Sequence, residues 1–170
     1  MQILKSKRSM LILVTLASII ALGVTTALAQ EKVKVKRKAF GVKIKSERIQ
    51  FDDTEGHYLT LSEWKGVTSD GEFTRYATSF GDLIKGNGPF NGYVKYVDRN
   101  GNAYFSKYKG MLTTTKSKEG KPIASIKGTY SYIKGTGKFE NIQGGGNFKG
   151  NFIGKGIYAM DSEGEYVIKK

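Results

Sequence analysis

Apolar and polar residues alternate along most of the chain after residue 30. In residues 32–36 the order is Lys-Val-Lys-Val-Lys, and the same alternation resumes as Val-Lys-Ile-Lys in residues 42–45. A period of two is typical of a β-strand with one buried face. A lysine-rich flank also discourages edge-to-edge pairing between sheets. We therefore expect a protein built from strands.

Nine segments carry this strand pattern, and turn signals rich in Gly, Asn, Asp and Lys separate most of them. Asn-Gly and Asp-Gly pairs supply the positive backbone angles that tight hairpins require. We expect a further turn at residues 161–164 (Asp-Ser-Glu-Gly), and a short helical turn is possible at residues 81–85. The expected strands are 42–51, 57–65, 72–80, 90–98, 103–115, 123–133, 146–153, 155–160 and 164–169.

Short strands joined by hairpin turns predict an all-β fold. A single antiparallel meander barrel of about eight strands accounts for the spacing and leaves no open sheet edge. Several glycines lie inside the strands, among them Gly92, Gly110, Gly128 and Gly150. Glycine weakens a strand unless it permits a bend or a close backbone approach, and small barrels need such bends.

The N-terminus has the three zones of a secretory signal peptide. Lys5, Lys7 and Arg8 precede an apolar run over residues 10–24, and an A-x-A pattern ends at Ala29. An uncleaved anchor is the alternative, but a membrane-spanning helix needs about 20 apolar residues. We expect a signal peptide at 1–29, an N-terminal basic segment at 30–39 and the barrel domain at 40–170. Cleavage leaves no transmembrane anchor, and the protein is expected to be exported, either periplasmic or extracellular.

The composition narrows the range of partners. The formal net charge is +13, with no cysteine and one histidine. A cationic exported protein can contact an anionic envelope component, whereas cytosolic nucleic acid is not expected as a partner. A zinc site needs three or four nitrogen or sulfur ligands, so we predict no metal and no cofactor.

The C-terminal third carries a pattern of turn glycines and aromatic residues. It runs Gly128-Thr129-Tyr130, Gly135-x-Gly137-x-Phe139, Gly144-x-Gly146-x-Phe148-x-Gly150 and Gly164-Glu165-Tyr166. With these motifs the chain resembles bacterial proteins with an allene oxide cyclase barrel-like domain, which are related in shape to dirigent proteins. The resemblance implies an eight-stranded barrel with a central cavity and allows a homo-oligomer. It implies no catalytic residue.

The candidate ligand-binding residues are polar or aromatic side chains expected at the lumen or rim of the barrel. His57 and Glu63 lie on one face of a predicted strand and could serve acid–base chemistry. Alternatively, His57 begins the strand at an exposed rim, with Leu59 and Leu61 in the core. A barrel mouth is the usual place for a ligand, lined here by tyrosines with Arg75 or Glu63 as the polar contact. The full set is His57, Glu63, Arg75, Tyr93, Tyr96 and Tyr104.

Three functions remain open from the sequence. The first is a non-catalytic exported barrel that binds a small hydrophobic or amphipathic ligand or an envelope component, or that has only a structural role. The second is a cyclase or isomerase that acts on a hydrophobic substrate in the cavity. The third is an adhesive surface protein that uses its positive charge. A solidly packed lumen would exclude ligand binding and cyclase activity alike.

Overall fold

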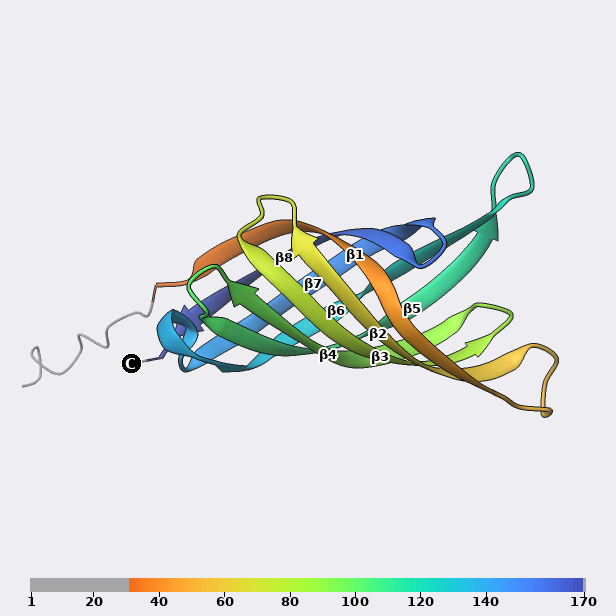
Figure 1. Ribbon diagram of the computed structural model, residues 1–170, viewed down its shortest axis with the longest axis horizontal. Helices are drawn as coiled ribbons and strands as arrows, with labels where there is room; N and C mark the ends of the chain where they lie inside the picture. The colour runs from red at the N-terminus through yellow and green to blue at the C-terminus, as the bar shows by residue number, and fades with distance from the viewer. Residues whose placement is uncertain (1–30, 170) are drawn as a thin grey trace, which may run out of the picture. The chain divides into compact units, whose positions relative to one another are not determined.

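The computed structural model describes residues 31–169 and consists almost entirely of strands (Figure 1). The predicted signal peptide at 1–29 lies outside the described residues. No helix within residues 31–169 is long and apolar enough to cross a membrane. The strands are β1 (Val33–Gln50), β2 (His57–Thr68), β3 (Phe73–Ile84), β4 (Gly88–Asp98), β5 (Ala103–Lys116), β6 (Pro122–Gly135), β7 (Ile142–Gly154) and β8 (Ile157–Ile168), with a single-turn 3-10 helix, η1 (Gly137–Phe139), between β6 and β7.

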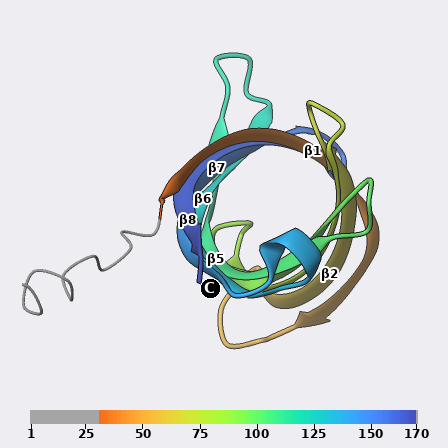
Figure 2. The same cartoon turned by 90° about the vertical axis from the view of Figure 1, so that its left-hand side faces the viewer.

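The eight strands form one closed antiparallel barrel in sequence order, which confirms the predicted fold class. Viewed along the barrel, the strands make a ring with η1 at the near end (Figure 2). The possible helical turn at 81–85 is not formed, because β3 continues to Ile84 and a tight turn follows. The single helical turn of the described chain is η1 instead.

The barrel closes where β1 pairs with β8. Three β1 lysines lie directly opposite three β8 acids in the register: Lys34 with Glu165, Lys36 with Glu163, and Lys38 with Asp161. Opposite charges in facing positions stabilise a strand pair by about 0.2–1 kcal/mol each. The basic segment is thus the first part of β1.

The same pairing corrects the turn expected at 161–164. Asp161 and Glu163 point outward from the middle of β8, which pairs continuously with β7 through Lys149–Asp161 and Gly146–Gly164. The segments 155–160 and 164–169 therefore belong to one strand. Asp161 and Glu163 resemble a turn signal in the sequence, but in the structure they are the cross-strand partners of β1 lysines.

The inward face of β1 is set by Val35, Ala39 and Gly41, all of which are buried. Residues of the opposite parity point outward, so Val42 and Ile44 are 49% and 60% exposed. The alternation at 42–45 is correct, but its apolar side is the solvent side. Lys43 consequently lies on the lumen face, just before a register shift between Lys43 and Lys45.

One end of the barrel, which we call the closed end, is filled by aromatic side chains. Phe73 is 1% exposed, and its ring centroid lies 5.5 Å from that of Tyr104 and 5.9 Å from that of Phe139 in η1. Burial of such rings is the main source of stability in a protein without disulfides. The loops at the opposite end, which we call the open end, join β1 to β2, β3 to β4, β5 to β6 and β7 to β8 (Figure 1).

Asp98 ties the β4–β5 turn to η1 at the closed end. Its carboxylate accepts hydrogen bonds from the backbone N–H groups of Asn100 and Asn102, and it pairs with Lys138 at 2.8 Å. The hydrogen bond from Lys138, followed by those from Asn102, lowers the pKa of Asp98 to about 2. The carboxylate therefore stays ionised and holds this end together at all but strongly acidic pH.

Candidate ligand-binding cavity

The lumen above the aromatic floor is hollow. A cavity of about 350 Å³ extends from Arg37, Tyr104 and Tyr132 near the closed end to Gly86 and Thr114 at the open end. That volume is within the range of small-molecule sites. Inward residues near the open end, such as Arg48, are solvent-exposed because the lumen widens to solvent there.

Arg75 of β3 is the most buried charged group of the cavity wall, at 7% exposure. Its Nε donates a hydrogen bond to the Tyr96 hydroxyl at 3.2 Å, and its Nη1 donates to the Tyr158 hydroxyl. Burial acts to lower the pKa of Arg75, but the oxygens of Tyr96 and Tyr158 outweigh burial and raise the pKa overall. The guanidinium is therefore a permanent buried cation.

Arg37 of β1 also contacts the aromatic floor. Its Nη1 donates a 2.9 Å hydrogen bond to the Tyr104 hydroxyl, and its guanidinium carbon lies 4.6 Å from the Phe73 ring centroid. The Tyr96 and Tyr104 rings stack at 4.8 Å. The floor is thus a pair of stacked phenols, each of which accepts a hydrogen bond from an arginine.

Two further cations line the cavity toward the open end. The Lys43 ammonium lies 5.1 Å from the centroid of the Trp64 ring, and the Arg48 guanidinium lies 3.8 Å from the centroid of the Tyr58 ring. Partial burial, followed by repulsion from Arg48, lowers the pKa of Lys43. The interior is therefore electropositive from floor to mouth.

Apolar side chains cover the wall between these charges. Phe90 lies 6.1 Å from Phe148 between ring centroids, and Trp64 lies 5.8 Å from Phe152. Leu112 and Ile126 complete this side of the cavity. A ligand that fills the lumen would thus contact rings and aliphatic groups along most of its length.

Two buried polar atoms of the cavity lining have no hydrogen-bond partner among the described residues. They are Nε1 of Trp64 and Oγ of Ser106, and Ser106 is only 1% exposed. Buried polar groups are nearly always hydrogen-bonded, and an unpaired one costs about 1–3 kcal/mol. Both atoms are almost completely shielded from solvent, so the residues that line the cavity include two unsatisfied polar groups.

Four tyrosines of the lumen remain protonated at neutral pH. Burial raises the pKa of Tyr104, Tyr108 and Tyr132, and it raises the pKa of Tyr158 more than Arg75 lowers it. Ser79 and Tyr108 share a 2.7 Å hydrogen bond. These hydroxyls can bind a ligand through hydrogen bonds. A protonated phenol acts neither as a general base nor as a nucleophile.

Strand glycines make room for the contact between Arg75 and Tyr158. A Cβ at Gly41 would overlap the phenol of Tyr158, and one at Gly66 would overlap the backbone carbonyl of Phe40. The Tyr158 ring thus crosses a surface without side chains before it meets Arg75.

Gly41→Ala is expected to destabilise the protein by about 1–3 kcal/mol, because the added methyl displaces the buried Tyr158 ring. Urea unfolding followed by circular dichroism measures the loss. Gly81→Ala is the matched control, since its Cβ would meet only side-chain atoms of Leu83 and Thr60 at 3.5 Å or more. Equal losses in the two variants would contradict this account of Gly41.

His57 lies at the rim of the open end, at the start of β2. Its Nδ1 is 2.5 Å from the Asp53 carboxylate, and its Nε2 is 2.9 Å from the Asp82 carboxylate. Hydrogen bonds to Asp53 and then to Asp82 raise the pKa of His57. Protonated His57 therefore connects the β1–β2 loop to the end of β3, beside the Lys85–Glu55 ion pair at 2.8 Å.

The unfolding free energy is expected to fall as pH rises above about 6.5, the ordinary value for histidine. Because His57 has a higher pKa in the folded state, its stabilisation is complete below that value and is lost as pH rises through the folded pKa. Thermal unfolding between about pH 5.5 and about pH 9 measures this slope. The variant His57→Asn should flatten it, and an unchanged slope would exclude His57 as the source.

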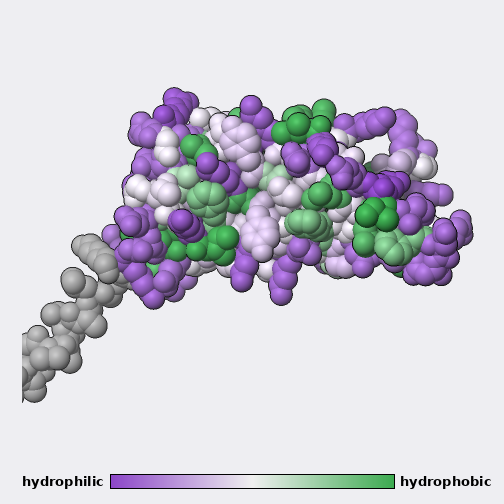
Figure 3. Space-filling view, turned by 60° about the horizontal axis from the view of Figure 1, so that its bottom comes forward, coloured by the Kyte–Doolittle hydropathy of each residue, from purple (hydrophilic) through white to green (hydrophobic). Residues whose placement is uncertain are grey.

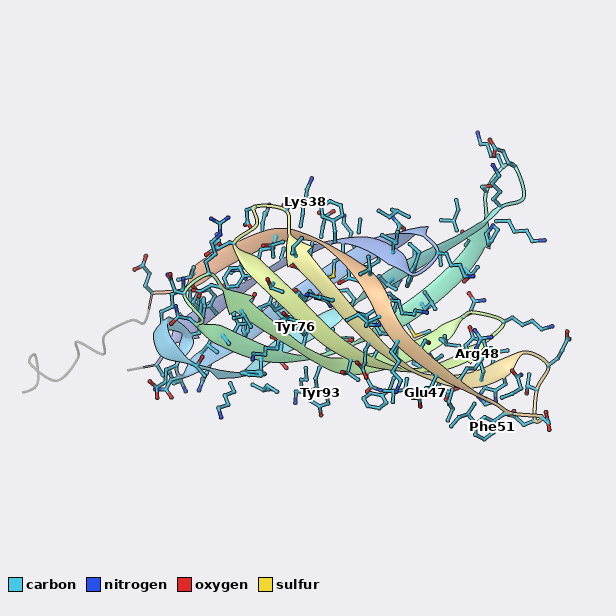
Figure 4. The ribbon with its side chains drawn as sticks, in the orientation of Figure 1. Lys38, Glu47, Arg48, Phe51, Tyr76 and Tyr93 are labelled. Atoms are coloured by element: carbon cyan, nitrogen blue, oxygen red, sulfur yellow. The ribbon has the colours of Figure 1, made fainter. Side chains whose placement is uncertain are left out.

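The structure separates the six residues proposed from the sequence. Arg75, Tyr96 and Tyr104 line the cavity, and His57 lies at its rim. The prediction that Glu63 and Tyr93 lie at the lumen or rim is wrong. Both lie on the outer face, where they border a depression, and Tyr93 is 58% exposed. Figure 4 shows Tyr93 pointing away from the barrel. The outer surface there mixes apolar and polar residues (Figure 3).

The expectation that Leu59 and Leu61 fill the core is wrong as well. In β2 the lumen face carries Tyr58, Thr60, Ser62 and Trp64, and Leu61 is 37% exposed. The polar face lies inside because the lumen is hollow near the open end.

Sequence reasoning missed Arg37, Lys43, Arg48, Trp64 and Tyr158, all of which line the cavity. The signal that was missed is the alternation of side chains between the two faces of a strand, by which residues of the same parity (odd or even number) share a face. Arg37 and Lys43 share parity with Val35, Ala39 and Gly41, and the register shift that follows brings Ser46 and Arg48 to the same face.

A closed ring of eight antiparallel strands around an open, cation-lined interior defines a small single-cavity β-barrel. A protein of unknown function from the DUF3224 family of Shewanella oneidensis MR-1 shares this fold, with a TM-score of 0.53, 15% identity, and coverage of 82% of this chain and 99% of that one. A pterocarpan synthase dirigent protein has a TM-score of 0.50 and 9% identity, covering 82% and 92% of the two chains. The sequence matches no family model and no curated protein.

At these identities the likeness shows the fold alone, which is dirigent-like. The resemblance to dirigent proteins is supported in that sense. The narrower resemblance to allene oxide cyclase barrel-like proteins stays a prediction.

Proposed function

We propose that the protein is an exported, non-catalytic barrel that binds a small amphipathic ligand in its lumen. The observation that carries the proposal is the open cavity of about 350 Å³, with an apolar wall and polar donors at its floor. A lumen that served only structure would be filled with side chains, as the closed end is. Export rests on the N-terminal sequence pattern.

The chemistry of the lining favours binding over turnover. Its titratable groups are arginines, Lys43 and tyrosines, and the pKa values of Tyr104 and Tyr158 are raised. Such groups fix a ligand through charge and hydrogen bonds, whereas a general base works best with a pKa near the ambient pH.

Trp64 provides the test, because it is the single tryptophan of the chain and lines the cavity. The neutral fluorophore N-phenyl-1-naphthylamine should bind with one-site saturation and accept excitation energy from Trp64. Ala124→Phe narrows the lumen and should weaken binding by about tenfold or more.

Ala159→Phe is the matched control, since Ala159 lies on β8 and is not part of the cavity lining. It should leave the affinity unchanged. Absence of saturable energy transfer, or equal affinities in the two variants, would overturn the proposal.

A cyclase or isomerase is the second candidate, because a pterocarpan synthase dirigent protein shares the fold. The two functions predict different fates for a bound ligand. A binding protein returns its ligand chemically unchanged after incubation, whereas an enzyme returns a product that mass spectrometry distinguishes from it.

A further inference from the structure

The charged residues of the cavity are all cations. Among the described residues that line it, the charged ones are Arg37, Lys43, Arg48 and Arg75. Each cation lies over an aromatic face: Arg37 over Phe73 at 4.6 Å, Lys43 over Trp64 at 5.1 Å, Arg48 over Tyr58 at 3.8 Å and Arg75 over Tyr158 at 5.2 Å.

No acid of the described chain forms an ion pair with a cavity cation. Within residues 31–169, the ion pairs involve Lys32, Lys45, His57, Lys85, Lys121 and Lys138. Asp70, on the β2–β3 turn, contributes negative charge near Arg37. Arg75, by contrast, is surrounded by neutral phenols.

Arg75 also has donors to spare. An arginine carries five N–H donors, and two of those on Arg75 are used by Tyr96 and Tyr158 within the described structure. The unpartnered Nε1 of Trp64 is a donor only, and the ring of Trp64 packs 5.5 Å from that of Tyr158, which Arg75 contacts. The hydroxyl of Ser106 can donate as well.

We propose that the lumen recognises an amphipathic organic anion whose acid group binds at Arg75. This inference deepens the proposed function and rests on it. A buried guanidinium forms its strongest contacts with a carboxylate, through two parallel hydrogen bonds. The anion accepts its hydrogen bonds from the N–H groups of Arg75 that Tyr96 and Tyr158 do not use.

The rest of the site fits the same ligand. The apolar body of the anion packs between Phe90, Phe148 and Phe152 in the direction of the open end. Lys43 and Arg48 lie along the entry route, and their field raises the local concentration of anions at the mouth. The cations at the mouth therefore attract ligands of negative charge, which is the charge that Arg75 binds.

Matched aromatic probes test this inference on the purified protein. We expect 2-naphthoate to bind about 10–100-fold more tightly than its neutral methyl ester, as titration calorimetry and Trp64 fluorescence would show. The cation 2-naphthylmethylamine should bind more weakly than either. Arg75→Met should remove the preference for the anion, whereas Arg99→Met, which removes a charge from an exposed turn, should preserve it.

The outcomes separate the two proposals. Equal affinities for the anion and the ester would overturn anion recognition and leave the binding function standing. Failure of naphthoate, its ester and N-phenyl-1-naphthylamine to bind would overturn both. If Arg75→Met does not fold, Arg48→Met at the mouth should still reduce the rate of naphthoate association, and the comparison of probes on the unmodified protein decides the question alone.

Discussion

Phe73→Ala is expected to destabilise the barrel by about 3–5 kcal/mol. The side chain is 1% exposed and lies among the rings of Tyr96, Tyr104 and Phe139, with the Arg37 guanidinium over its face. Removing the ring opens a void that the surrounding strands, fixed by the barrel ladder, can fill only in part.

This loss is large relative to the free energy of unfolding of the whole protein. A domain of this kind has a total stability of about 5–15 kcal/mol, so the variant would be partly unfolded at moderate temperature. The midpoint and slope of guanidinium unfolding give the change in free energy.

Phe80→Ala is the matched control, because Phe80 lies on the same strand, β3, but faces outward with 45% exposure. It should cost less than about 1 kcal/mol. Similar losses in the two variants would show that the aromatic cluster at the closed end is not the main core of the protein.

The fold was predictable because it depends on period and turn chemistry. Alternating residues and Asn-Gly or Asp-Gly turns were enough to indicate an antiparallel barrel. The continuity of β8 through residues 161–164 was not predictable, because Asp161 and Glu163 are of residue types that are common in turns. Their pairing with Lys38 and Lys36 of β1 and with residues of β7 shows that they belong to a strand.

The site was predictable in kind and only partly in its residues. Sequence patterns assume that the apolar face of a strand points inward, and Val42 and Leu61 do not obey that assumption. A hollow lumen reverses it, because inward positions near the mouth contact solvent or a ligand. Arg75 was predicted as a polar contact of a tyrosine-lined barrel mouth, and the structure places it in the cavity wall. The basic residues of β1 were attributed to the protection of a sheet edge.

Arg75→Met is expected to raise the unfolding free energy of the ligand-free protein by about 1–2 kcal/mol, while it abolishes selective anion binding. Burying a guanidinium costs several kcal/mol, and neutral phenols recover only part of this cost. The hydroxyls of Tyr96 and Tyr158 border the cavity, so water can replace the lost donor. Methionine has a flexible apolar side chain that fills the vacated space.

The order of stability should reverse when an anion is present. At 100 times its dissociation constant, 2-naphthoate would stabilise the native protein by about 2.7 kcal/mol and leave the variant nearly unchanged. Thermal unfolding of both proteins, with and without naphthoate, measures the crossing. A variant that is less stable than the native protein under both conditions would assign Arg75 to the structure. A crossing would mean that the barrel keeps a destabilising cation because its ligand requires one.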